Sequence, residues 1–131
     1  MKVSRSTGYA LLAVGYIAKN GNKGIILSQA IAKQYDIPLE YLLKILQQLV
    51  RANVLRSKRG PRGGFQLAKS PSKISMLEII EAVDGPLAGD LNLEEFSGAQ
   101  KYGKKAEQVY IKAINQAKSV FEKAKLSALL T

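Results

Sequence analysis

The 131-residue chain contains no cysteine, no histidine and no tryptophan. Without cysteine or histidine it can form no disulfide, no thiolate or imidazole metal site and no cysteine-ligated iron–sulfur cluster. The same absences exclude catalytic systems in which histidine activates a serine or cysteine. Carboxylate and lysine chemistry remain, but no group of such residues indicates an active site. We therefore do not expect an enzyme, and we expect no cofactor.

Long apolar runs are also missing. The run YALLAVGYIA at residues 9–18 follows Lys2 and Arg5 as in a secretory signal, but it ends at Lys19 without a small-residue cleavage site. We interpret it as a buried amphipathic helix. No stretch approaches the ~20 apolar residues of a membrane-spanning helix. The sequence therefore predicts a cytoplasmic protein without a membrane partner.

Acidic residues are scarce in the first half of the chain. Residues 1–69 hold 12 Lys and Arg but two acids, whereas residues 70–131 hold eight Lys and eight acids. The whole net charge of +10 therefore lies in the first half. Such asymmetry is typical of a segment that binds nucleic acid or an anionic membrane, and a basic surface kept for solubility is the alternative.

Three helices are expected in this basic half. Ser4 is a plausible N-cap for a helix that runs to about Lys19, and Ser28 for a second that ends near Tyr35. A third helix, LEYLLKILQQLVRAN, follows almost at once. Two helices separated by a turn of about three residues have the proportions of a helix-turn-helix.

A hairpin follows the third helix. The strand-like runs VLRSKR and FQLAK flank the turn GPRGG, and residues 75–78 match a capping box that opens a fourth helix. Three helices followed by a hairpin form a winged helix. The predicted fold is therefore mainly α with a small β-hairpin, and the winged helix-turn-helix domain occupies residues 1–85.

The second half has a different organisation. Residues 86–103 contain four Gly and Pro without a sustained period and are interpreted as a linker, and residues 104–131 as one long helix. Apolar residues recur along this helix at alternating spacings of four and three, the 3.5-residue period of coiled coils. They are Ala106, Tyr110, Ala113, Ala117, Val120 and Ala124. A lone helix of this type needs a partner surface, and we favour a second copy over packing on its own body.

The basic half offers contacts for duplex DNA, whose major groove admits one α-helix. The start of the third helix would face the bases, while the start of the second helix and the chain start would contact phosphates. The candidate contacts in these helices are Lys2, Arg5, Ser28, Gln29, Leu39, Glu40, Tyr41 and Lys44.

The hairpin tip supplies a second group of candidates, with arginines that can clamp phosphates or enter a narrow minor groove. Its glycines permit positive φ and leave no side chain between loop and DNA, and its proline stiffens the turn. These candidates are Lys58, Arg59, Gly60, Pro61, Arg62, Gly63 and Gly64. A nucleotide-binding loop is disfavoured because a strand, not a helix, follows the glycines.

Residues 1–85 resemble the Rrf-type bacterial winged-helix regulators, the family of IscR, NsrR and CymR. The resemblance lies in "YL" of the third helix, in SKRGPRGGFQLAK and in ISMLEIIEAVDG. It implies a homodimeric transcriptional regulator that binds a partly palindromic operator with a reading helix and a wing for each half-site. In the family the closing long helix is the dimerisation helix.

The chain departs from the family pattern at three places. Cluster-binding members carry three cysteines after the fourth helix, and residues 86–103 contain none, so the resemblance implies a member without an iron–sulfur cluster. Leu43 stands where several members have a glutamate used in base selection. Pro38 stands where a capping serine is frequent.

We therefore expect a sequence-specific, dimeric DNA-binding regulator, a repressor in preference to an activator. A small-molecule effector or a protein partner would control it. The alternative is an architectural DNA-binding protein without sequence preference. Its affinity for DNA would depend mainly on the salt concentration.

Overall fold

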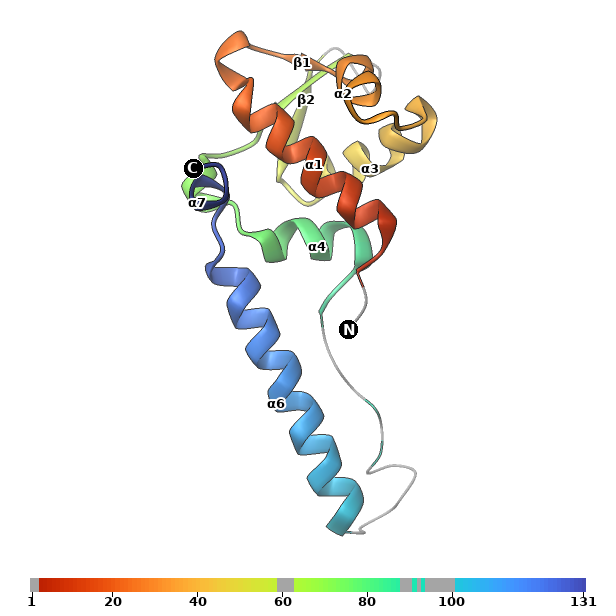
Figure 1. Ribbon diagram of the computed structural model, residues 1–131, viewed down its shortest axis with the longest axis vertical. Coiled ribbons are helices and arrows are strands. Elements are labelled where there is room, and N and C mark those ends of the chain that lie inside the picture. The colour runs from red at the N-terminus through yellow and green to blue at the C-terminus, as the bar shows by residue number, and fades with distance from the viewer. Residues whose placement is uncertain (1–2, 59–62, 88–90, 92, 94–100) are drawn as a thin grey trace.

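The computed structural model describes residues 3–58, 63–87, 91, 93 and 101–131. These residues form a packed body and a long helix that extends away from it (Figure 1). The body contains α1 (Arg5–Lys19), α2 (Ser28–Tyr35), α3 (Leu39–Arg51) and α4 (Met76–Asp84), and the long helix is α6 (Lys101–Lys123). A mainly helical winged helix-turn-helix fold with a long C-terminal helix is confirmed.

Local sequence signals explain most helix ends. The hydroxyl of Ser4 accepts a hydrogen bond from the N–H of Thr7 at 3.2 Å, as expected of the N-cap of α1. Asp36 takes a left-handed conformation, with φ 54°, that ends α2, and Pro38 occupies the N-cap position of α3. The prediction that Ser28 caps α2 was wrong, because α2 already begins at Ser28 and Leu27 holds the N-cap position.

The sheet has one strand more than the predicted hairpin. Strands β2 (Leu55–Lys58) and β3 (Gly64–Leu67) pair antiparallel as expected, and β1 (Ile26–Leu27) pairs with the other edge of β3. A strand of two residues carries no periodicity of its own. It forms because β3 offers it an open edge, which a local sequence pattern does not reveal.

The core lies between α1, α3 and the sheet, with the last turn of the chain at its border. Each element contributes its apolar side, in accordance with its helix or strand period. The fully buried apolar side chains include Val14, Ile17, Ile31, Leu42, Leu46, Leu49, Val54, Leu55, Phe65, Ile74 and Ile79.

The end of the chain returns to the body. The prediction of one helix to the C-terminus was wrong, since α6 ends at Lys123 and a short helix, α7 (Leu126–Leu129), follows. Between them the carbonyl of Ala124 accepts the N–H of Met76 at 2.8 Å, and the N–H of Leu126 donates to the carbonyl of Ile74 at 2.8 Å. These bonds replace helical ones and place Leu126 in the core, where it is 4% exposed.

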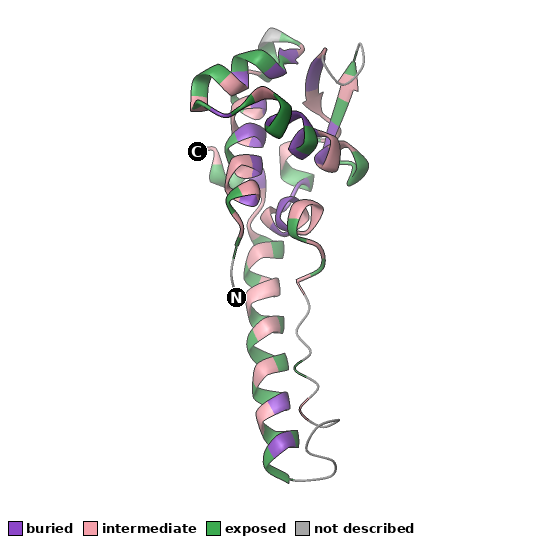
Figure 2. Ribbon diagram, turned by 90° about the vertical axis from the view of Figure 1, so that its right-hand side faces the viewer, coloured by how far each residue is buried: buried purple, intermediate pink, exposed green. Residues whose placement is uncertain are grey.

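Burial divides the molecule. Figure 2 shows buried residues throughout the body, whereas most of α6 is exposed or half-buried. Gly103 and Glu107 are the buried residues of α6. The body is thus a self-contained packing unit, and the long helix presents its surface outward.

Candidate nucleic-acid interface

Helix α3 carries a continuous polar stripe on its outer side. Glu40, Lys44 and Arg51 are exposed, and Gln47 and Gln48 between them are half-buried. Their spacing of three to four residues places them along one side of the helix. The opposite side anchors α3 in the core through Leu42, Ile45, Leu46 and Leu49. A rigidly held helix with a polar outer side has the form that the DNA major groove admits.

One predicted contact at the start of α3, Leu39, is less open than expected, because it is half-buried. Leu43, which stands where several members of the resembled family have glutamate, is packed inward with 5% exposure. Leu43 therefore offers no side chain to a base in this arrangement.

Tyr41 is held against α1. Its hydroxyl shares a short hydrogen bond with the hydroxyl of Ser6, and its ring meets that of Tyr9 edge-on with centroids 5.8 Å apart. The side chain is still 39% exposed. Besides the expected DNA contact, Tyr41 therefore has a structural role: it fixes the start of α3 relative to the start of α1.

The other helical candidates lie at the starts of α1 and α2. Arg5 and Gln29 are exposed, whereas the side chain of Ser28 is 1% exposed. Ser28 can therefore contact a phosphate only through its backbone at the start of α2. Lys2 lies outside the described residues.

The structure describes the two strands of the wing, β2 and β3. Lys58 at the end of β2 is exposed and Gly63 is half-buried. Gly64 is buried, and a Cβ added to it would lie 1.5 Å from Cγ2 of Ile25. Glycine is thus required at position 64 so that Ile25, just before β1, can pack against β3. This packing role is in addition to any DNA contact. Arg59, Gly60, Pro61 and Arg62 lie outside the described residues.

A polar cluster joins the start of α1 to the end of α4. The carboxylate of Asp84 accepts hydrogen bonds from the hydroxyl of Ser4 at 2.6 Å, the hydroxyl of Thr7 at 2.7 Å and the N–H of Ser4 at 3.2 Å. Partial desolvation raises the pKa of Asp84, but these three hydrogen bonds together hold it below the usual value. The cluster positions the first turn of α1, where Ser6 contacts Tyr41 of α3.

Several residues of this surface were not predicted from the sequence. Ser6 joins it through Tyr41, and Gln47, Gln48 and Arg51 extend it along α3. The helical period continued from Glu40 and Lys44 predicts positions 47, 48 and 51 on the same side. That signal was present, whereas nothing in the sequence indicated the contact of Ser6 with Tyr41.

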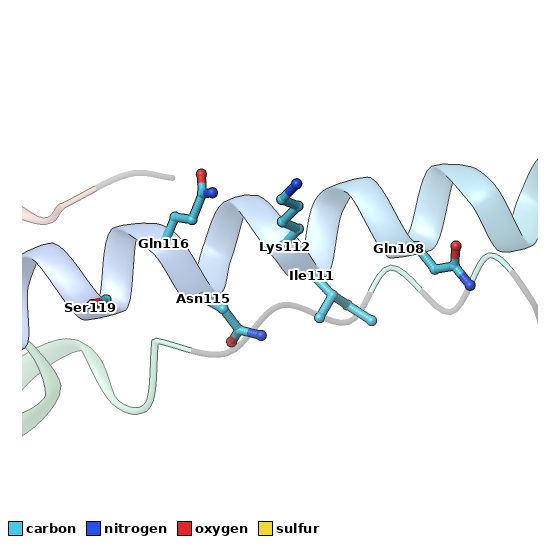
Figure 3. A pocket seen from close by; sticks show the side chains of 6 residues that line it. All are labelled: Gln108, Ile111, Lys112, Asn115, Gln116 and Ser119. Atoms are coloured by element: carbon cyan, nitrogen blue, oxygen red, sulfur yellow. The ribbon is translucent and has the colours of Figure 1, made fainter.

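Helix α6 presents a separate, apolar surface. Tyr102, Val109 and Val120 are 81%, 70% and 67% exposed. An open groove of about 440 Å³ runs along the helix, and the described residues that line it all belong to α6: Gln108, Ile111, Lys112, Asn115, Gln116 and Ser119 (Figure 3). Near the start of the helix, the buried carboxylate of Glu107 accepts the N–H groups of Leu91 and Leu93 at 3.1 and 2.8 Å.

Neither a metal site nor a membrane span is found in the part of the chain that the structure describes. No three acidic side chains there come together as a metal-binding group. None of the described helices is both long and apolar enough to cross a bilayer.

Helices α2 and α3, the short turn between them and the sheet that follows define a winged helix-turn-helix protein of the DNA-binding type. The family model described as "Iron-dependent Transcriptional regulator" matches residues 3–130. The chain belongs to this family, Rrf2, whose named members are transcriptional regulators and not enzymes.

Relatives and solved structures agree with this assignment. The regulator IscR of Cereibacter sphaeroides is 38% identical over 87 residues, which cover 64% of this chain and 56% of IscR. A protein of Aquifex aeolicus with the provisional name of an HTH-type transcriptional regulator is 42% identical over 81 residues. The structure of CymR, the global cysteine regulator of Bacillus subtilis, superposes with a TM-score of 0.83 at 25% identity and covers 99% of this chain and 96% of CymR.

The extent of these matches differs between sequence and structure. The sequence matches span 51–59% of the length of the relatives, so the chain covers little more than half of each of them. The family model and the CymR superposition both extend over the long helix. The DNA-binding class is therefore supported by all of these comparisons.

Proposed function

We propose that the protein is a homodimeric, sequence-specific DNA-binding transcriptional regulator that works without an iron–sulfur cluster. The observation that carries this proposal is the polar stripe of α3, which is held rigidly by a core on one side and flanked by the wing. Each protomer would place α3 in the major groove of one half-site. The exposed side chains of Glu40 and Lys44, with Tyr41 at the edge, would face the bases.

Phosphate contacts would fix this helix in register. Arg5 at the start of α1, Gln29 in the first turn of α2 and Lys58 of the wing are exposed and would supply cations or donors. The wing tip, with Arg59 and Arg62, would extend the contact to the next stretch of the duplex. The net charge of +10 agrees with such a polyanionic partner.

The dimer is proposed from α6. Its exposed Val109 and Val120 belong to a helix surface that the chain itself leaves uncovered, and the structural likeness to CymR extends over this helix. Pairing of two α6 helices would bring two reading helices to a fixed separation of about one turn of DNA, ~34–36 Å. A partly palindromic operator follows from that symmetry.

Regulation would act through the same geometry. An effector or a partner protein that changes the angle between the two α6 helices would change the distance between the reading helices and thereby operator affinity. We propose repression in the cytoplasm as the mode of action, since a dimer bound across an operator excludes other proteins from it.

Selection of duplexes from a random pool, followed by competition of the selected duplex with a scrambled one, tests the proposal. We expect the selected duplex to bind at least 100-fold more tightly at physiological salt. In Arg59→Ala the affinity for the selected duplex should fall roughly 5- to 150-fold. Arg56→Ala is the matched control, because Arg56, in strand β2 of the wing, already donates to the carbonyl of Ala68 at 3.2 Å. Equal binding to selected and scrambled duplexes would instead establish an architectural DNA-binding protein.

A further inference from the structure

Two hollows flank the second half of α3. One, of about 370 Å³, lies towards α1 and is lined by Ser6, Tyr41, Lys44, Gln47, Gln48 and Arg51, with Ile45 at its floor. The other, of about 270 Å³, lies towards the wing and is lined by Gln47, Val50, Arg51, Ser57 and Phe65. Gln47 and Arg51 border both hollows. They therefore form a ridge that stands between two depressions of the surface.

A ridge of this kind fits the shape of a major groove. The floor of the groove presents base edges, and the two phosphate backbones form its walls. A helix ridge that enters the groove leaves a depression on each side for one backbone. The hollow towards α1 carries Lys44 and the hydroxyl of Ser6, and the hollow towards the wing carries the hydroxyl of Ser57. Both sides thus offer cations or hydroxyl groups to phosphates.

The crest of the ridge is polar. Glu40, Lys44, Gln47 and Arg51 follow one another at spacings of four, three and four residues, and this polar stripe, in which Gln47 is half-buried, extends over nearly the whole of α3. Gln47 lies midway between the cations Lys44 and Arg51. Its carboxamide has a donor and an acceptor side by side, which match N7 and the N6 amino group of adenine in the major groove.

We propose that Gln47 is a specificity-determining residue that reads an adenine in each operator half-site. This inference rests on the proposed function and extends the reading surface beyond the start of α3, to which the sequence analysis had confined it. Gln48 borders the hollow towards α1 only and faces a phosphate backbone. Arg51 closes the stripe at the end of α3 and contacts a phosphate from the ridge.

Altered specificity tests this role. Random-pool selection is carried out with the full-length wild-type chain, with Gln47→Ala and with Gln47→Glu. Duplexes that carry each of the four base pairs at every position of the selected half-site are then compared by fluorescence anisotropy. In the wild type we expect one position to prefer adenine roughly 5- to 100-fold. This preference should fall below about twofold in Gln47→Ala and move towards cytosine in Gln47→Glu, because a carboxylate accepts from the cytosine amino group.

A matched control and two contrary results complete the test. Gln34→Ala removes an exposed glutamine of α2 that lines neither hollow, and it should leave the selected motif unchanged. If both Gln47 variants keep the wild-type preference at every position, or lose affinity equally for all duplexes, Gln47 reads no base and the inference is overturned while the proposed function stands. If the wild type itself selects no motif, the proposed function fails and the role of Gln47 with it.

Discussion

The body of the protein and its helix α6 use apolar residues in opposite ways. In the body, α1 and α3 each bury one side, and Ser4 and Asp84 form hydrogen bonds at the start of α1. Along α6, the side chains of Tyr102, Val109 and Val120 are 67–81% exposed, and two residues of the helix are buried. The two regions therefore differ in how their apolar side chains are covered.

This difference separates the tasks of the two regions. Propensity alone gives the 23-residue α6 little stability, and Val109 and Val120 are exposed within one chain, so the proposed second copy would stabilise this helix. The body has its core within one chain and can keep its reading helix in place alone. The contrast predicts that changes on α6 alter assembly and that changes in the body alter folding.

The largest effect is expected from charges on the exposed face of α6. In Val109→Glu/Val120→Glu, pairing of two copies would bury four carboxylates, which costs several kcal/mol because buried charges lack compensation. The dimer dissociation constant should rise by at least about 100-fold, and operator affinity should fall with it. Sedimentation equilibrium measures the first and fluorescence anisotropy the second.

Circular dichroism distinguishes a loss of assembly from a loss of folding in this variant. The body of Val109→Glu/Val120→Glu should retain its circular dichroism spectrum, because both valines are exposed within one chain. Gln34→Glu, which adds one carboxylate on the exposed side of α2, is the charge control and should remain dimeric. A double variant that stays dimeric would show that α6 pairs through another face or not at all.

A smaller effect is expected where the chain returns from α6 to the body. Leu126→Ala removes a side chain that is 4% exposed in the core, and the free energy of unfolding should fall by about 2–5 kcal/mol. Leu129→Ala is the matched control, since Leu129 is 52% exposed and should cost less than about 1 kcal/mol. Urea unfolding measures both. Equal values for the two variants would contradict the assignment of Leu126 to the body.

Local patterns predicted the elements of the body well. The caps at Ser4 and Ser75 and the strand-like runs around the wing are short-range signals, and each marks an element that is present. These signals succeed because capping, proline geometry and amphipathic periods act within a few residues.

The features that the sequence did not reveal are contacts between distant segments. Strand β1 exists because β3 accepts it, and Gly64 is required because Ile25 lies over it. The residues KAKLSALL after position 122 have a helical composition, yet backbone bonds to Ile74 and Met76 interrupt the helix. The hydrogen bond of Ser6 with Tyr41 joins residues 35 positions apart. Tertiary contacts of this kind override local propensity.

The smallest effect on stability is expected at the polar cluster that joins the start of α1 to the end of α4. Because hydrogen bonds hold the pKa of Asp84 below its usual value of 3.8, the folded state favours the charged form. This contribution is present above pH 4 and is lost as the pH falls through the lowered pKa of the folded state. Asp84 is largely exposed, so we expect Asp84→Asn to lower the free energy of unfolding by only about 0.5–1 kcal/mol at pH 7.

The pH dependence of this difference is the decisive measurement. Urea unfolding of the wild type and Asp84→Asn at pH 7, 5 and 3 should give two curves that converge at the acid end, because the wild-type carboxyl then becomes neutral as well. Asp84→Ala should cost more than Asp84→Asn at every pH, since it leaves the fully buried hydroxyl of Thr7 without its acceptor. A difference between wild type and Asp84→Asn that does not change with pH would mean that the shape of residue 84, and not its charge, anchors α1 to α4.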